Sequence, residues 1–233
     1  GSIVGYARDN QLSDPEAEIL EKLKDAFCTK SLISYFEETE KNLDKVLKIF
    51  IRVNSGGTQL SYSDLLMSIL TANFSSDIRD LMNKFVDSVR DQGFGVMGRD
   101  QVLKTCLLLT ESNHIFQLKN FSKSNINKIE ANWVKITETI FKAIKLLQEF
   151  GYTNRLSSAY ILSIVAYYIF RNENYSQDNK EQMLNFVRNA QITSYFTTSL
   201  DGKLEVAAKT LRDSDNFKDF NEKLSNSKVQ PLK

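Results

Sequence analysis

The residues best suited to chemistry lie in one short polar loop, Asn54-Ser55-Gly56-Gly57-Thr58, which follows Arg52 and joins two apolar-periodic segments. A glycine-containing loop that leads into a helix N-terminus can bind an anion through its backbone N–H groups. Arg52, Asn54 and Thr58 add side-chain donors near the same helix start. The pattern fits an ordinary turn between helices and also a phosphate or nucleotide contact, and both interpretations stay open. It is not a P-loop, because it has no lysine and follows a helical pattern rather than a strand.

The segment after this loop has a strong helix-start signature. Ser61 is a favourable N-cap residue, and Asp64 three positions later completes a capping box. Leu60 and Leu65 occupy the positions of a hydrophobic staple, and the apolar spacing predicts a helix to about Asn73. Phe50 lies on the apolar face of the helix expected before the loop.

Other catalytic or metal-binding chemistry is poorly represented. The single histidine, His114, lies in a polar connector, and no CxxC or HExxH pairing accompanies it, so we predict no metal site. No GxSxG elbow is present that would place a serine beside that histidine. Cys28 and Cys106 both lie among apolar neighbours, and we expect buried, reduced thiols of a cytoplasmic protein.

Composition leaves the question of a nucleic-acid partner open. Thirty Lys+Arg against 29 Asp+Glu give a net charge of +1, so any basic surface must be local. Basic and aromatic residues alternate in Lys119-Asn120-Phe121-Ser122-Lys123, a pattern that is also common on solvated loops. Four aromatic residues on an apolar helix are expected in the core rather than on a base-stacking surface: Tyr160, Tyr167, Tyr168 and Phe170.

The elements that must position the loop are helices. Only 9 Gly and 2 Pro interrupt the 233 residues, which favours long helices. Apolar spacing of three and four residues predicts helices over 14–27, 43–53, 65–73, 77–89, 99–110, 125–150, 159–170 and 178–190, and a turn at Asp201-Gly202 before a short helix to Leu211. Residues 159–170 are apolar on every side and should lie at the centre. We therefore predict an all-α protein, an irregular multi-helix bundle around the helix Ala159 to Phe170.

The expected domain organisation has three parts. Residues 1–29 form an N-terminal helical segment that begins with a tag-cleavage scar, Gly1-Ser2. Residues 30–215 form the main helical domain. Residues 216–233 form a short helix and a frayed tail. The longest apolar run is too short for a membrane span, so no membrane partner is expected.

Residues 49–65 resemble the second signature of a large prokaryotic family, the domain-of-unknown-function family 262, also called the GmrSD restriction endonuclease N-terminal domain family. The matching positions follow the pattern FxRxNSGGT and continue through Leu60, Ser61, Asp64 and Leu65. The resemblance extends over most of residues 30–215. It implies a role in defence against phage or modified foreign DNA.

In that family an N-terminal half of ParB/sulfiredoxin-like fold carries a DGQQR motif, which no part of residues 1–233 contains. The resemblance therefore implies that this chain is the C-terminal helical portion. It would complete a nucleotide- or DNA-processing site with a missing N-terminal domain, be inactive alone, and need no cofactor itself. The full-length protein would use a nucleoside triphosphate with Mg²⁺. Two alternatives stay open: an autonomous helical nucleic-acid-binding module, and an enzyme in its own right.

Overall fold

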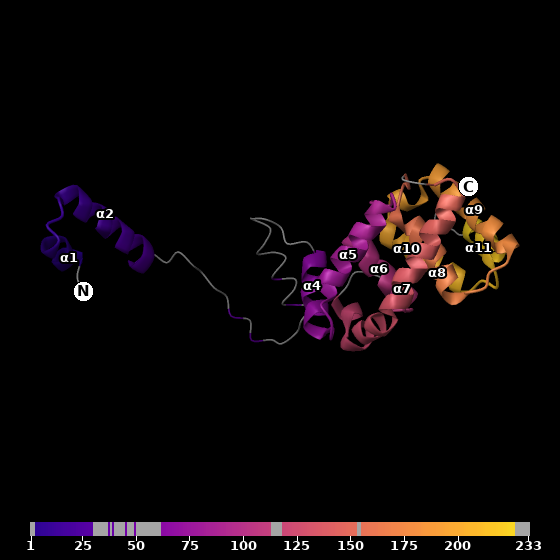
Figure 1. Ribbon diagram of the computed structural model, residues 1–233, viewed down its shortest axis with the longest axis horizontal. Helices are drawn as coiled ribbons and strands as arrows, with labels where there is room; N and C mark the ends of the chain where they lie inside the picture. The colour runs from indigo at the N-terminus through magenta and orange to yellow at the C-terminus, as the bar shows by residue number, and fades with distance from the viewer. Residues whose placement is uncertain are drawn as a thin grey trace. The chain divides into compact units, whose positions relative to one another are not determined.

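The protein is all-α, as predicted, and the described helices of residues 62–226 form a multi-helix bundle (Figure 1). The computed structural model describes residues 3–29, 62–112, 118–152 and 155–226, together with the single residues Glu37, Thr39, Lys45 and Ile49. The chain divides into two compact units, residues 1–46 and 47–233. The predicted helix over 43–53, the polar loop and the tail from residue 227 lie outside the described ranges, and the predicted domain boundaries stay predictions.

The described part of the N-terminal unit includes α1 (Ile3–Asp9), α2 (Asp14–Lys24) and the π-helical turn η1 (Asp25–Thr29). The start of α2 is fixed locally, because the Glu16 carboxylate accepts hydrogen bonds from the Ser13 hydroxyl at 2.7 Å and the Ser13 N–H at 2.9 Å. These bonds hold the pKa of Glu16 below its usual value. The expectation of a buried thiol at Cys28 is wrong: Cys28 is exposed, because η1 lies in a unit whose described residues include none that are buried.

The second unit holds the core of the protein. Its described elements are α4 (Tyr62–Asn73), α5 (Ile78–Asp91), α6 (Arg99–Leu109), the 3₁₀ turn η3 (Leu118–Phe121), α7 (Lys123–Glu149), α8 (Ala159–Arg171), α9 (Gln177–Ile192), the 3₁₀ turn η4 (Tyr195–Thr197), α10 (Leu200–Arg212) and α11 (Phe217–Ser225). None of these helices combines the length and apolar character that a bilayer span requires.

Helix α8 is the central helix of this bundle. Every residue from Ala159 to Ile169 is buried, and α8 packs against α6, α7, α9 and α10. Because the helix is apolar on all sides, burial from several directions is its most favourable placement. Its serine, Ser163, is completely buried, and its hydroxyl is paired with that of Thr105 of α6 at 2.7 Å, which satisfies both polar groups. The prediction of a central helix is confirmed.

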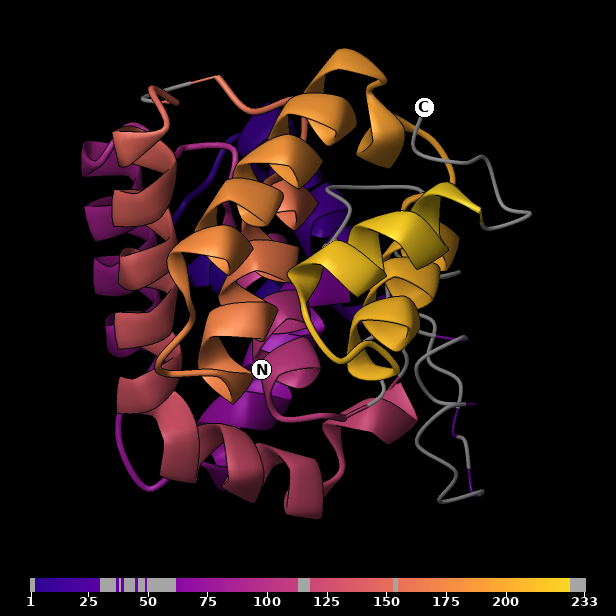
Figure 2. The same ribbon diagram turned by 90° about the vertical axis from the view of Figure 1, so that its right-hand side faces the viewer.

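Helix α7 is the longest described element, about 40 Å at 1.5 Å per residue. Ser122 caps its start by accepting from the N–H of Asn125. At its end Gly151 adopts a left-handed conformation, φ +86°, and the N–H of Tyr152 reaches back to the carbonyl of Leu147 at 2.9 Å. Helix α5 lies beside α7, where Phe85 packs edge-on against Trp133 and Phe141 (Figure 2).

The C-terminal helices are joined by an aromatic cluster. Phe186 of α9 packs against Phe196 of η4 and against Phe217 and Phe220 of α11. The predicted turn at Asp201-Gly202 is wrong, because α10 already begins at Leu200. The chain turns instead through Ser199, whose φ is +52°. Asp201 therefore lies in the first turn of α10, where a carboxylate is favoured by the helix dipole.

Candidate functional site

The predicted loop site cannot be placed in the bundle, because nearly all of it falls outside the described residues. This holds for Phe50, Arg52, Asn54, Ser55, Gly56, Gly57, Thr58 and Ser61. His114 also falls outside them. Asp64, in the first turn of α4, is a described position of this pattern, and its carboxylate forms an ion pair.

Asp64 is tied to two other helices through Arg99, the first residue of α6. The Arg99 guanidinium donates to the Asp64 carboxylate at 3.1 Å and to the side-chain oxygen of Asn83 on α5 at 3.2 Å. Both side chains of the ion pair are a little over one-third exposed, so the pair is only partly screened by solvent. The first turn of α4, which directly follows the signature loop in sequence, is thereby held against α5 and α6.

Arg99 also lines an open pocket of about 410 Å³ with Asn83, Val86, Asp87, Arg90 and Gly98. Its charged groups are already matched, because Arg90 bonds to Asp87 at 2.8 Å and Arg99 bonds to Asp64. This pocket therefore offers little uncompensated charge to a ligand.

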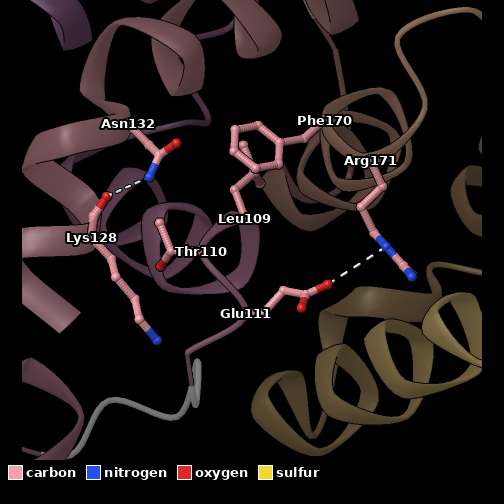
Figure 3. A pocket seen from close by; sticks show the side chains of 7 residues that line it. All are labelled: Leu109, Thr110, Glu111, Lys128, Asn132, Phe170 and Arg171. Atoms are coloured by element: carbon pink, nitrogen blue, oxygen red, sulfur yellow. Dashed lines mark hydrogen bonds and ion pairs between the residues drawn. The ribbon is translucent and has the colours of Figure 1, made fainter. Parts of the chain in front are cut away.

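A second pocket, of about 300 Å³, lies where α6 and α8 end beside α7 (Figure 3). We call it the helix-end pocket. It is lined by Leu109, Thr110 and Glu111 from the end of α6, Lys128 and Asn132 from α7, and Phe170 and Arg171 from the end of α8. Leu109 and Phe170 form an apolar centre, with Lys128 on one side and Glu111 and Arg171 on the other (Figure 3). An apolar wall with a few convergent polar groups is the usual composition of a small-molecule site.

The backbone at Glu111 is strained. Its φ is +53°, and its N–H donates to the carbonyl of Leu108 at 3.1 Å, while Ser112 donates to Leu107 at 2.9 Å. These bonds make a Schellman motif, in which the left-handed position is normally glycine. Helices α5 and α7 place Gly93 and Gly151 there. A glutamate at this position costs free energy that a glycine would not, which draws attention to its side chain.

The Glu111 carboxylate connects α6 to α8. It accepts a hydrogen bond from the Tyr167 hydroxyl at 3.4 Å and pairs with the Arg171 Nε at 3.5 Å. The Tyr167 hydroxyl in turn accepts from the Arg212 Nε at 3.3 Å, and this bond holds the pKa of Arg212 above its usual value. Arg171 is thus a basic residue that lines this side of the pocket, where it is paired with Glu111; Arg212 does not line the pocket.

The α7 side of the pocket is also basic. Asn132 is anchored by its amide, which donates to the backbone carbonyl of Lys128 at 2.8 Å. Lys135, seven residues beyond Lys128, lies 4.8 Å from the ring centroid of Phe170 and pairs with Glu173 at 2.8 Å. That pair holds the pKa of Glu173 below its usual value.

The predicted core role of the α8 aromatics is confirmed for Tyr160, Tyr167 and Tyr168, which are buried. Phe170 is only half-buried, because it lies at the end of α8 where the helix-end pocket opens.

Sequence reasoning missed this pocket. A usable signal was present: a glutamate rather than a glycine directly after α6, and polar residues 128, 132 and 135 at helical spacing.

An ion pair elsewhere in the bundle joins Lys104 of α6, whose side chain is almost buried, to Asp201 of α10, whose side chain is half exposed. Burial by itself lowers the pKa of Lys104, but the hydrogen bond to Asp201 and the nearby Tyr160 hydroxyl together raise it above its usual value. The Lys104 ammonium also lies 5.5 Å from the centroid of the Tyr160 ring. This arrangement joins α6 to α8 and α10.

Among the residues that the structure describes, no group of three or more His, Cys, Asp or Glu side chains is arranged to hold a metal ion. Comparison with known proteins gives no assignment, because no protein-family model matches this chain and no curated protein shows a significant match.

Proposed function

We propose that this chain is the helical portion of a prokaryotic phage-defence or restriction-type protein of the GmrSD N-terminal domain family, acting in the cytoplasm. It would complete a nucleotide- or DNA-processing site together with a DGQQR-containing domain of ParB/sulfiredoxin-like fold. The observation that carries the proposal is the run of matching residues 49–65, with Arg52, Asn54 and Gly56-Gly57 at the positions of the signature.

The local structure around Asp64 supports this proposal. Helix α4 begins at Tyr62, directly after the signature loop, which agrees with a loop that leads into a helix N-terminus. The contacts of Arg99 with Asp64 and Asn83 hold the start of that helix in place. A loop whose downstream end is held in this way can present Arg52 and Asn54 in a reproducible orientation to a second domain.

The proposal can be tested by reconstitution. The coding sequence upstream of Ile3 and its neighbouring genes should encode a DGQQR motif. Residues 1–233 mixed with that domain should hydrolyse nucleoside triphosphates in the presence of Mg²⁺, whereas neither part alone should do so. Arg52→Ala should abolish the activity of the mixture, while Lys84→Ala, at an exposed lysine of α5, should not change it. Hydrolysis by residues 1–233 alone, or no activity of the mixture, would overturn the proposal.

An autonomous nucleic-acid-binding module is the second candidate. The observation that favours it is the row of exposed lysines on α7, where Lys128, Lys135 and Lys142 recur every seven residues and extend over about 21 Å. If these lysines contact phosphates, the logarithm of the DNA association constant falls with the logarithm of the salt concentration with a slope of about −0.9 per contact. Replacing all three lysines by glutamine should then reduce the magnitude of this slope by almost three. Weak binding that does not respond to salt would exclude this candidate.

A further inference from the structure

The helix-end pocket has the chemistry of a site for a flat ligand that carries a phosphate group. We propose that it binds a free purine mononucleotide, with guanine preferred as the base. This inference goes beyond the proposed function, because none of the residues that line the pocket belongs to the signature 49–65.

The apolar centre of the pocket suits an aromatic base. Leu109 is almost completely buried and Phe170 is half-buried, and both face the opening (Figure 3). Nucleic-acid bases stack on aromatic side chains with little dependence on their identity, so Phe170 provides a contact for a base but does not select one. Selection must come from the polar groups at the edge of the pocket.

Glu111 provides the means of selecting guanine. Its carboxylate can accept about four hydrogen bonds, and its two contacts, with Tyr167 and Arg171, are long at 3.4 and 3.5 Å. Guanine presents two adjacent donors, a ring N–H and an exocyclic amino group, which match the two oxygens of a carboxylate. Adenine presents a ring acceptor beside its amino group, and that acceptor would face the carboxylate unpaired. An unpaired polar group of this kind costs much more affinity than a missing apolar contact.

The strain at Glu111 agrees with a binding role for its side chain. Glycine occupies the equivalent left-handed position after α5 and α7, and it would stabilise the same turn after α6. The Schellman motif directs the Glu111 carboxylate toward the pocket and the C-terminal end of α8, where Tyr167 and Arg171 orient it. Strained residues that surrounding contacts hold in place are typical of ligand-binding sites.

The phosphate group fits the opposite side of the pocket. Lys128 lines the pocket from α7 and is exposed, and in this view Thr110 lies between it and Glu111 (Figure 3). Lys135, beside Phe170 on the same helix, has its charge matched by Glu173, so Lys128 provides the positive charge for the phosphate. A mononucleotide bound with its base against Glu111 and Phe170 would thus place its phosphate near Lys128, where a charge-assisted hydrogen bond can form.

Calorimetric titration with guanosine monophosphate, adenosine monophosphate, guanosine and inorganic phosphate tests the inference. Guanosine monophosphate should bind saturably and about tenfold or more tightly than adenosine monophosphate, which corresponds to about 1.4 kcal/mol. Lys128→Gln should weaken guanosine monophosphate about tenfold and leave guanosine unchanged, since only the phosphate contact is lost. Glu111→Gln should weaken both ligands. Lys145→Gln, the same change at an exposed lysine of α7 that does not line the pocket, should weaken neither.

Three outcomes would overturn the inference. These are no saturable binding of guanosine monophosphate at millimolar concentration, equal binding of inorganic phosphate and the nucleotide, and equal effects of Lys128→Gln and Lys145→Gln. Thermal unfolding of each variant should match that of the parent protein, so a loss of binding cannot be assigned to unfolding. The result does not depend on the DGQQR domain, because the titration measures binding to residues 1–233 alone.

Discussion

Gly151→Ala and Gly202→Ala add the same methyl group at two positions where a Cβ atom would have no neighbouring atom within 4 Å. The two positions differ in the backbone. Gly151 ends α7 with φ +86°, whereas Gly202 lies in the first turn of α10 and does not have a positive φ. Since neither methyl group meets an obstacle, any difference in the free energy of unfolding must come from backbone conformation.

The expected magnitudes follow from this geometry. At Gly202 alanine reduces the conformational entropy of the unfolded chain, so it should stabilise the protein by about 0.4–1 kcal/mol. At Gly151 the same entropy gain is opposed by about 1–2 kcal/mol for a left-handed alanine, which leaves a net loss of about 1 kcal/mol. Because the entropy gain is common to both, the two variants should differ by the left-handed cost alone, about 1–2 kcal/mol.

Thermal unfolding followed by circular dichroism, together with urea denaturation, measures this difference. For a chain of this size, 1 kcal/mol shifts Tm by about 2–4 °C. Gly202→Ala should therefore unfold a few degrees above the parent and Gly151→Ala a few degrees below it. If both variants shift in the same direction by the same amount, backbone conformation at Gly151 does not limit the stability of α7, and the reasoning is refuted.

Three further predictions follow from the described contacts. Burial raises the pKa of Cys106 to about 12, so its thiol should resist alkylation until the protein unfolds. Its contribution to stability should be lost as pH rises from about 9 toward 12. Alkylation followed by mass spectrometry, and unfolding at alkaline pH, check these expectations, and rapid labelling of the native thiol would contradict them. Hydrogen bonds from Ser75 lower the pKa of Glu130, so Glu130→Gln should reduce the stability lost as pH falls below about 4.5, and an unchanged acid profile would disprove the link between α4 and α7. Thr105→Val should lower the free energy of unfolding by about 1 kcal/mol, and the double change with Ser163→Ala should lower it by less than the sum of the two single changes. Strict additivity in a double-mutant cycle measured by denaturant unfolding would show that the buried hydrogen bond does not couple the two residues.

Local signals account for the parts of the fold that were predicted correctly. The capping box at Ser13 and Glu16 and the glycine at 151 act within one turn of their helices, so their effects can be read from neighbouring residues. The turn expected at Asp201-Gly202 was wrong for a related reason. A glycine and an aspartate also suit the first turn of a helix, and the contact between Asp201 and Lys104 joins residues that lie far apart in sequence.

Burial of individual side chains was predicted less well. Cys28 and Cys106 have similarly apolar neighbours in sequence, yet the first is exposed and the second completely buried. The difference arises because Cys106 lies on a helix that packs against α8, whereas Cys28 lies in the small N-terminal unit. Apolar neighbours show that a residue can be buried; they do not show which other element covers it.

The sequence by itself determined the helical class, the central position of α8 and the signature at 49–65, because helical periodicity, an all-apolar helix and a short motif are properties of consecutive residues. Only the tertiary structure decided that Arg99 holds Asp64 and that the helix-end pocket exists. The ends of α6 and α8 are about sixty residues apart in the chain, and they meet beside α7 because burial of the apolar α8 brings its neighbours together. The meeting also places Tyr167 and Arg171 of α8 within reach of the Glu111 carboxylate.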